Sequence, residues 1–192
     1  MDGVPVSGTT KIATVSEIDL PGGLKAYAEG KNGEYEFVIR DERIPGFADL
    51  REFATFPEDP IWRVEARYLP RGHGQTVEVE IATNLGHSVP MPTPAELVLT
   101  IEGEDYSLTC IEPFEGYRLV TFRDETSGSE TPEMGRWILL PEDVDYLSEI
   151  DLNRVVLPWH VVSPAFPCPL PNARNRLPMR VEAGEKSLVR DS

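Results

Sequence analysis

The sequence is short of positive charge, of cysteine and of long apolar runs. Lys and Arg number 18 against 33 Asp and Glu, so the formal net charge is −15. A surface this acidic repels phosphate backbones and anionic lipids, which excludes nonspecific binding to nucleic acids and to membrane surfaces. Two cysteines are too few for a disulfide scaffold. No apolar run approaches the roughly 18 residues that a membrane-spanning helix needs.

The chain also lacks the features of a signal peptide, because residues 1–6 contain no basic residue and no apolar core follows them. We therefore expect a cytoplasmic protein. Apolar residues make up 40% of the 192 residues and charged residues 27%, which is typical of a folded globular chain. This length predicts a single β-rich domain over residues 1–192.

Proline and glycine are abundant, with 18 and 15 copies, and they disfavour long helices. Apolar and polar residues alternate in several short stretches, which places one side of each on a core and the other in water. A hairpin is predicted where Glu102–Asp105 separates two such stretches. Because hairpin follows hairpin, the pattern predicts a mainly β fold, either an antiparallel β-barrel or a two-layer β-sandwich. The alternating stretches are 33–40, 62–68, 76–81, 96–101 and 179–183, the last of which is predicted to be the final strand, and 106–111, 117–122 and 136–140 are predicted as further strands.

Other regions depart from this pattern. Good helix formers predict short helices over 48–53 and over 141–147, and the second begins with Pro and two acidic residues. Residues 1–40 are expected to add N-terminal strands to the same body. The segment 158–178 is too rich in proline for a central strand or a helix, yet it is also apolar. We therefore predict that it forms an extended arm packed on the sheet.

Several segments resemble the patterns of one bacterial and archaeal family. Phe56–Val64 resembles its FPxDPxWRV segment, and residues 122–136 resemble FRDxTSGxETYxxGR. Asp151–Arg154 resembles the start of DFNRA, and residues 168–185 resemble the ending CPLPxxxNRLPxxxxAGE. In this order, the segments resemble the family known as domain of unknown function 1684. The resemblance implies a mostly β fold with a polar segment around Arg123–Arg136, and it implies no agreed activity.

The chain differs from that family in three respects. It looks shortened at the N-terminus, where family members usually carry an additional segment. Pro132 stands where the family has a tyrosine, and His160 stands where it has a cysteine. The differences at Pro132 and His160 fall in or beside the segments that carry the resemblance, so these positions bear directly on any function the family shares.

Arginines and other polar residues of these segments are the candidate ligand-binding residues, because guanidinium groups bind carboxylates and phosphates through paired hydrogen bonds. If they converge on one cavity, they would bind an anion there. The alternative is that nearby acidic residues neutralise each arginine within the fold, which would make the same residues structural. The candidates are Arg123, Asp124, Glu130, Arg136, Asn153, Arg154 and Arg176.

His160 and Cys168 are a second set of candidates. Imidazole and thiolate groups bind zinc, but two ligands with this spacing match no standard zinc pattern. The same two side chains could instead form a nucleophile and its base. A third interpretation of His160 is a polar residue at the edge of the packed arm. His73, between Gly72 and Gly74, is interpreted as part of an exposed turn.

We therefore expect a small-molecule-binding β protein without a cofactor, whose ligand is an anionic or polyfunctional metabolite. If the protein is an enzyme, the absence of a nucleophile or cofactor motif favours a biosynthetic cyclisation or isomerisation directed by shape and electrostatics. An alternative is a non-catalytic interaction module, for example a homodimer, whose Arg and Asp residues form structural ion pairs. A third is a metal-dependent hydrolase that uses His160 and Cys168.

Overall fold

The computed structural model describes residues 17–31, 34–41, 49–82, 87–141, 144 and 147–191. They belong to two compact units, Met1–Ala48 and Asp49–Ser192. The prediction that the N-terminal strands share one domain with the rest of the chain stays a prediction. Among the described residues, no helix has the length and the apolar character that crossing a bilayer requires.

The first unit contains a three-stranded antiparallel sheet in the order β1-β2-β3. Gly22 and Gly23 form the turn between the first two strands with φ angles of 81° and 78°, which residues with a side chain rarely adopt. The third strand corresponds to the stretch predicted over 33–40, although Gly33 lies outside the described residues. The strands are β1 (Ile18–Leu20), β2 (Leu24–Lys31) and β3 (Glu34–Asp41).

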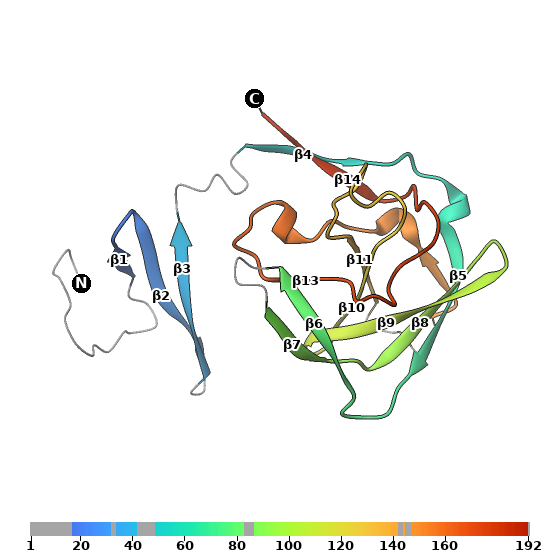
Figure 1. Cartoon of the computed structure of the whole chain (residues 1–192), viewed down its shortest axis with the longest axis horizontal. Coiled ribbons are helices and arrows are strands. Elements are labelled where there is room, and N and C mark those ends of the chain that lie inside the picture. Colours follow the sequence, from blue (N-terminus) through green and yellow to red (C-terminus); the bar gives the residue numbers. More distant parts are fainter. Residues whose placement is uncertain are drawn as a thin grey trace. The chain divides into compact units, whose positions relative to one another are not determined.

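The second unit is built on a six-stranded antiparallel sheet in the order β11-β10-β9-β8-β5-β12. Figure 1 shows this sheet curling into a half-barrel, so the prediction of a mainly β, antiparallel fold is confirmed. Glu102 and Gly103 form the turn between β8 and β9 with φ angles of 53° and 85°, as in the two-residue turns that suit twisted hairpins. The strands are β5 (Arg63–Pro70), β8 (Ala95–Ile101), β9 (Glu104–Phe114), β10 (Tyr117–Phe122), β11 (Arg136–Leu139) and β12 (Glu149–Asp151).

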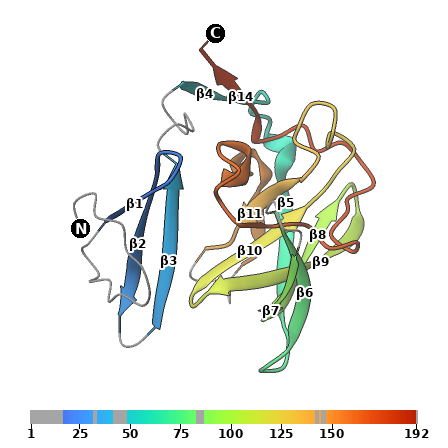
Figure 2. The ribbon, with the colours of Figure 1, turned by 60° about the vertical axis from the view of Figure 1, so that its left-hand side comes forward.

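Two smaller sets of strands complete the second unit. One is the hairpin of β6 (Thr76–Ala82) and β7 (His87–Pro92), to which β13 (Cys168–Pro169) adds a short edge. The other is the ribbon of β4 (Leu50–Thr55) and β14 (Glu185–Arg190). Figures 1 and 2 both show the hairpin and the ribbon on opposite sides of the unit.

The helix predicted over 48–53 is wrong, because Leu50–Phe53 belong to strand β4, while Ala48 lies outside the described residues. Phe53 pairs with Leu188 of β14, and the backbone hydrogen bonds of that ladder replace a helix too short to be stable alone. The helix predicted over 141–147 lies largely outside the described residues. Helical structure in the described part of the chain is limited to three 3-10 turns, η1 (Pro60–Trp62), η2 (Leu152–Arg154) and η3 (Trp159–Val161).

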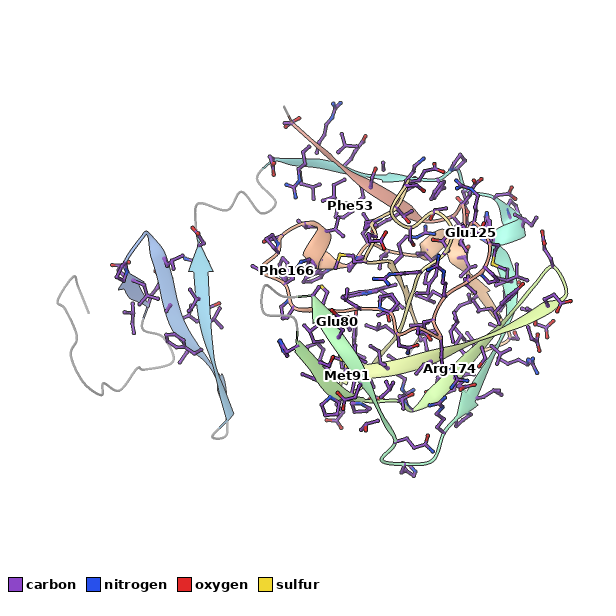
Figure 3. The ribbon with its side chains drawn as sticks, viewed as in Figure 1. Phe53, Glu80, Met91, Glu125, Phe166 and Arg174 are labelled. Atoms are coloured by element: carbon purple, nitrogen blue, oxygen red, sulfur yellow. The ribbon has the colours of Figure 1, made fainter. Side chains whose placement is uncertain are left out.

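Side chains fill the space that the curled sheet encloses, as Figure 3 shows. Residues from the sheet and from the C-terminal segments share this core, so the Pro-rich arm and the chain after it pack against the strands. Fully buried members include Leu97, Leu99, Val120, Phe122, Leu152, Leu177 and Val181. The interior is therefore a packed core, and concave sites lie at its margins.

Asn175 of the arm joins two neighbouring strands that have separated. The register between β9 and β10 shifts between Tyr117 and Leu119, and Leu119 with Ile111 is the last pair between the two strands. Beyond that pair, the Asn175 amide nitrogen donates to the carbonyls of Thr109 (2.9 Å) and Thr121 (2.8 Å), and its oxygen accepts from the Thr109 N–H (2.8 Å). The buried amide thus satisfies backbone groups that would otherwise lack partners.

Replacing Asn175 with Ala should lower the free energy of unfolding by about 3 kcal/mol, because buried backbone groups of both strands lose their partners. Urea denaturation followed by tryptophan fluorescence measures the change. Arg176→Ala, at the exposed neighbouring position, is the matched control and should change stability by less than about 0.5 kcal/mol. Equal unfolding midpoints for the two variants would contradict this role for the amide.

Candidate functional site

The polar loop that follows β10 is organised by the buried carboxylate of Asp124. Its oxygens accept hydrogen bonds from the Thr126 hydroxyl (2.8 Å), the Val181 N–H (2.7 Å) and the Arg136 Nη2 (3.2 Å). Neither partner of the Asp124–Arg136 ion pair has an exposed side chain. The carboxylate therefore joins the loop, strand β11 and the C-terminal segment, and it has no surface open to a ligand.

Arg136 completes this arrangement, which we call the Arg136 clasp. Its Nη2 donates to the Val181 carbonyl (2.7 Å), and its Nη1 donates to the carbonyl of Ala183 (2.5 Å). The guanidinium carbon lies 5.7 Å from the ring centre of Phe56 and 5.5 Å from that of Phe122, within the range of cation–π attraction. Burial lowers the pKa of Arg136, and the nearby carboxylate opposes that shift.

The clasp explains why the alternating stretch 179–183 is not a strand. Val181 and Ala183 are buried and Glu182 is exposed, as the alternation predicts. Their carbonyls, however, accept hydrogen bonds from the Arg136 guanidinium group and not from the backbone of a neighbouring strand. The final strand, β14, begins only at Glu185. Gly184 provides the bend before it, with a φ of 71°, and a Cβ there would lie 2.5 Å from the Val155 carbonyl oxygen.

Glu130 is also bound within the fold. It accepts hydrogen bonds from Lys186 (2.5 Å) and from Arg180, and the bond from Lys186 is the main reason that its pKa lies below the ordinary value. Glu130 lines a shallow pocket of about 610 Å³ beside β14, but both of its oxygens are already engaged. These contacts favour a structural role for this carboxylate.

Arg123 and Arg176 lie side by side, because residues 123 and 176 form an isolated parallel bridge. The Nε of Arg123 donates to the Glu133 carbonyl (2.8 Å), which closes the polar loop on itself. Arg176 is exposed. Neither arginine lines any of the three pockets described for this chain.

His160 and Cys168 are in contact, but through the backbone of the histidine. The His160 N–H donates to the Cys168 sulfur at 3.2 Å, while the ring Nδ1 lies 2.8 Å from the Phe166 carbonyl oxygen. Burial raises the pKa of the Cys168 thiol, which favours its neutral form. Within the described residues, no group of three or more His, Cys, Asp or Glu side chains could hold a metal ion.

Arg154 lines a pocket, and its position is fixed by the residues before it. The Asp151 carboxylate accepts from the N–H (3.0 Å) and the side-chain amide (2.9 Å) of Asn153. The same amide donates to the Asp59 carbonyl (2.9 Å), and its oxygen accepts from the Asp59 N–H (3.2 Å). Asn153 is therefore a structural clamp, and the next residue, Arg154, is held at an exposed point of the turn.

The pocket that Arg154 lines occupies the open seam of the half-barrel. β11 and β12 are the two outer strands of the six-stranded sheet, and residues of both line this pocket of about 580 Å³. Trp137 and Val156 exchange two backbone hydrogen bonds (2.9 and 3.0 Å) that close part of the seam. We call the remaining opening the seam pocket. Its walls are Ile138, Leu139, Leu140, Pro141, Leu147, Ile150 and Val155, and its charged residues are Arg63, Glu149, Asp151 and Arg154.

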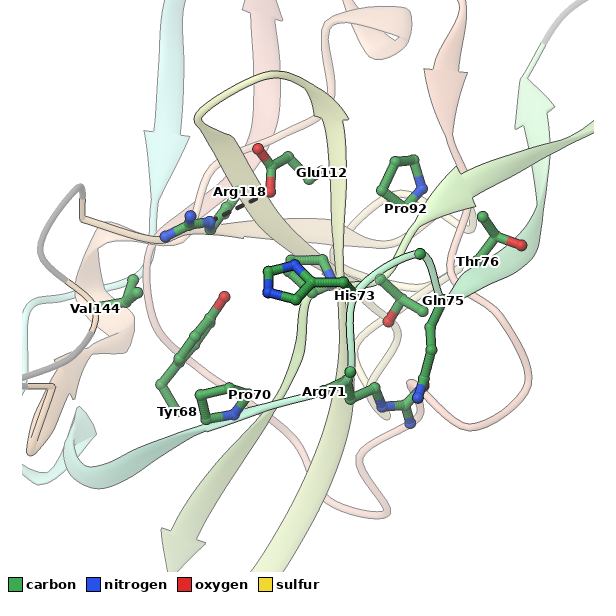
Figure 4. A pocket seen from close by; sticks show the side chains of 14 residues that line it. Tyr68, Pro70, Arg71, His73, Gln75, Thr76, Pro92, Glu112, Arg118 and Val144 are labelled. Atoms are coloured by element: carbon green, nitrogen blue, oxygen red, sulfur yellow. Dashed lines mark hydrogen bonds and ion pairs between the residues drawn. The ribbon is translucent and has the colours of Figure 1, made fainter.

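A second pocket, of about 660 Å³, lies where the turn after β5 meets β9 and β10. Figure 4 shows Tyr68, His73, Glu112 and Arg118 around it. We call it the polar pocket. The sequence gives no local signal for it, because these residues come from three strands of the six-stranded sheet and a turn, and His73 by itself is typical of an exposed loop. The motif arginines do not converge here: of the predicted candidates, only Arg154 and Glu130 line any of the three pockets.

Two comparisons place the chain among known proteins. A family model described as a protein of unknown function (DUF1684) matches residues 48–186. The chain is also similar to an uncharacterized protein of Haloarcula marismortui with a solution NMR structure, at 27% sequence identity and a TM-score of 0.55. That match covers 77% of this chain and 90% of the other. The comparison with curated proteins gives no match.

Replacing Arg136 with Met should lower the free energy of unfolding by about 3 to 5 kcal/mol, because Asp124 is left buried without its counter-charge. Arg180→Met, which removes an exposed pair with Glu130, should cost less than about 1 kcal/mol. The double variant Asp124→Asn/Arg136→Met should be more stable than the sum of its single changes predicts. Strictly additive losses in chemical denaturation would show that the two side chains do not act as a pair.

Proposed function

The chain belongs to the DUF1684 family, and we propose that it binds a small amphipathic carboxylate in the seam pocket. The observation that carries this proposal is Arg154, whose guanidinium group has no ion pair or hydrogen bond to any described residue. Of the candidate arginines, Arg154 alone combines a place in a pocket with the absence of an ion pair to any described residue, since Arg136 is paired with Asp124 and Arg123 and Arg176 line none of the three pockets. A ligand carboxylate would supply that partner through two parallel hydrogen bonds.

The walls of the seam pocket support an apolar body for this ligand. Leu139, at the end of the outer strand β11, is 43% exposed, and Leu140 and Leu147 line the same pocket. An apolar group that covers these side chains would remove their surface from water, which is favourable by roughly 25 cal/mol per Å². The seam pocket is lined by an arginine and by apolar side chains. This combination suits a ligand that has both a carboxylate and a short hydrocarbon chain.

The other charges of the seam pocket leave Arg154 as the main anion contact. Arg63 lies 3.6 Å from Asp151, so these two groups largely neutralise each other. Asp151 is further occupied by Asn153. Glu149 is exposed on β12 and disfavours a second negative group. We therefore expect selectivity for monocarboxylates over dicarboxylates.

A second candidate function, an interaction module, is favoured by the internal ion pairs of Arg136 and Glu130 and by exposed aromatic side chains. Phe114 is 74% exposed and Trp159 is 59% exposed. Exposed aromatic groups are enriched where proteins bind one another. If this candidate is right, sedimentation velocity at about 0.1 mM protein should detect a dimer that Phe114→Ser weakens. A chain that sediments only as a monomer would count against it.

Titration of 15N-labelled protein with hexanoate tests the carboxylate proposal. The amides of Leu139, Leu147 and Ile150 should shift, and Arg154→Gln should raise the dissociation constant about tenfold, because one charge-assisted contact worth about 1.5 kcal/mol is lost. Hexanol, which has the same chain but no carboxylate, should bind the native protein no better than hexanoate binds Arg154→Gln.

Arg176→Gln is the matched control, since it removes an exposed arginine that does not line the seam pocket. It should leave hexanoate binding unchanged. Equal weakening by the two substitutions would indicate a general effect of net charge. Undiminished binding to Arg154→Gln, or shifts confined to residues outside the seam pocket, would refute the proposal.

A further inference from the structure

The polar pocket differs in chemistry from the seam pocket and is held in shape by its own contacts. The turn after β5 is fixed by two backbone hydrogen bonds, from the Arg71 N–H to the Pro94 carbonyl (2.7 Å) and from the Thr93 N–H to the Gln75 carbonyl (3.0 Å). These bonds hold His73 at the margin of the pocket, as Figure 4 shows. The pocket is therefore a formed feature of the fold.

Most charged groups near the polar pocket already have strong partners. Arg71 forms an ion pair with Glu96, and hydrogen bonds from Ser107 and then from Arg71 hold the pKa of Glu96 below its ordinary value. Glu112 accepts a hydrogen bond of 2.7 Å from the Gly116 N–H. These groups stabilise the walls and leave Arg118 as the charged side chain with unused hydrogen-bonding capacity.

Arg118 is only weakly neutralised. Its Nε lies 3.4 Å from a Glu112 oxygen, at the long end of the range for such contacts. A guanidinium group has five N–H donors, and this contact uses one of them. The rest of the group extends over the ring of Tyr68, with its carbon 6.0 Å from the ring centre, on the side of the polar pocket.

Thr93 gives an independent indication that something binds in the polar pocket. It is 1% exposed and lines the pocket, and its buried hydroxyl oxygen has no hydrogen-bond partner among the described residues. A buried hydroxyl group without a partner is costly, and such groups are rare in folded proteins. An acceptor atom of a ligand would satisfy it.

We infer that the polar pocket binds a tetrahedral oxyanion, either inorganic phosphate or the phosphate group of a small monoester. The possible donors come from three separate segments: Arg118 from β10, His73 from the turn after β5, and Thr93, which is buried in the pocket wall, from the connection before β8. A planar carboxylate has only two oxygens, whereas a phosphate offers three or more acceptors in different directions. This site is separate from the seam pocket, and its test does not depend on hexanoate binding.

Phosphate titration of the 15N-labelled protein, at an ionic strength held constant with sodium chloride, tests the inference. The amides of Gly72, His73, Gly74 and Thr93 should shift with phosphate and stay in place with chloride. Arg118→Gln should weaken phosphate binding about tenfold, because the main charged donor is lost. Arg67→Gln, an exposed arginine on β5 outside the pocket, is the control and should bind as the native chain does.

Thr93→Val separates a binding role for the hydroxyl from a structural one. The valine has the same shape and removes a hydroxyl that has no partner in the described part of the chain. It should therefore weaken phosphate binding about fivefold while leaving the urea unfolding midpoint without phosphate equal to or above that of the native chain. A lower midpoint with unchanged phosphate binding would overturn the inference.

Glycerol phosphate distinguishes the two sources of the anion. Tighter binding than inorganic phosphate would identify the phosphate group of an organic molecule as the ligand, and weaker binding would identify free phosphate. If chloride produces the same shifts as phosphate, or if Arg118→Gln and Arg67→Gln bind alike, the polar pocket is not a phosphate site.

Discussion

The buried ion pair of Arg136 and Asp124 is the interaction on which the second unit depends. It connects the loop after β10, the start of β11 and the C-terminal segment, all of which would otherwise expose unpaired backbone groups to the core. A buried charge is unfavourable unless it is paired and fully hydrogen-bonded, and both conditions hold here except at the Arg136 Nε, which has no partner among the described residues. The position of the C-terminal segment therefore depends on the Arg136 and Asp124 side chains.

The clasp also explains why the segments that resemble the DUF1684 family are spread along the chain. The ring centres of Phe56 and Phe122 lie 5.7 Å and 5.5 Å from the guanidinium carbon, and the polar loop and Ala183–Glu185 supply its partners. Residues far apart in sequence thus contact the same guanidinium group. All of them lie within residues 48–186, the range that the family model matches, and a shared structural element accounts for them without a shared catalytic site.

Much of the architecture could be predicted from the sequence, because it is encoded locally. Alternation along a strand and the Glu102–Gly103 turn both depend on a few neighbouring residues. The failures have a common cause. Residues 50–55 and 179–183 adopt conformations set by distant partners, the strand β14 in one case and Arg136 in the other, and neither partner can be identified from local pattern.

The candidate site residues likewise divide into those that local sequence identifies and those that depend on distant parts of the chain. Sequence resemblance selected Arg136, Asp124 and Glu130, yet the fold uses all three internally. It also selected Arg154, which does line a pocket, because the clamp of Asn153 and Asp59 leaves the next residue exposed. The polar pocket was missed because its parts come from separate elements, and no single stretch contains more than a fragment of it. A single sequence does not show which residues from separate elements lie close together in the fold.

The most direct measurement of the clasp is native-state hydrogen exchange at the Val181 amide, which donates to the Asp124 carboxylate rather than to a neighbouring strand. If the clasp holds the second unit together, this amide should exchange only through global unfolding, with the same protection and the same urea dependence as the amides of Leu97 and Leu99 in the centre of the sheet. If the Val181 amide exchanges through local opening, much faster than those core amides, the C-terminal segment detaches on its own, and this result would contradict the account.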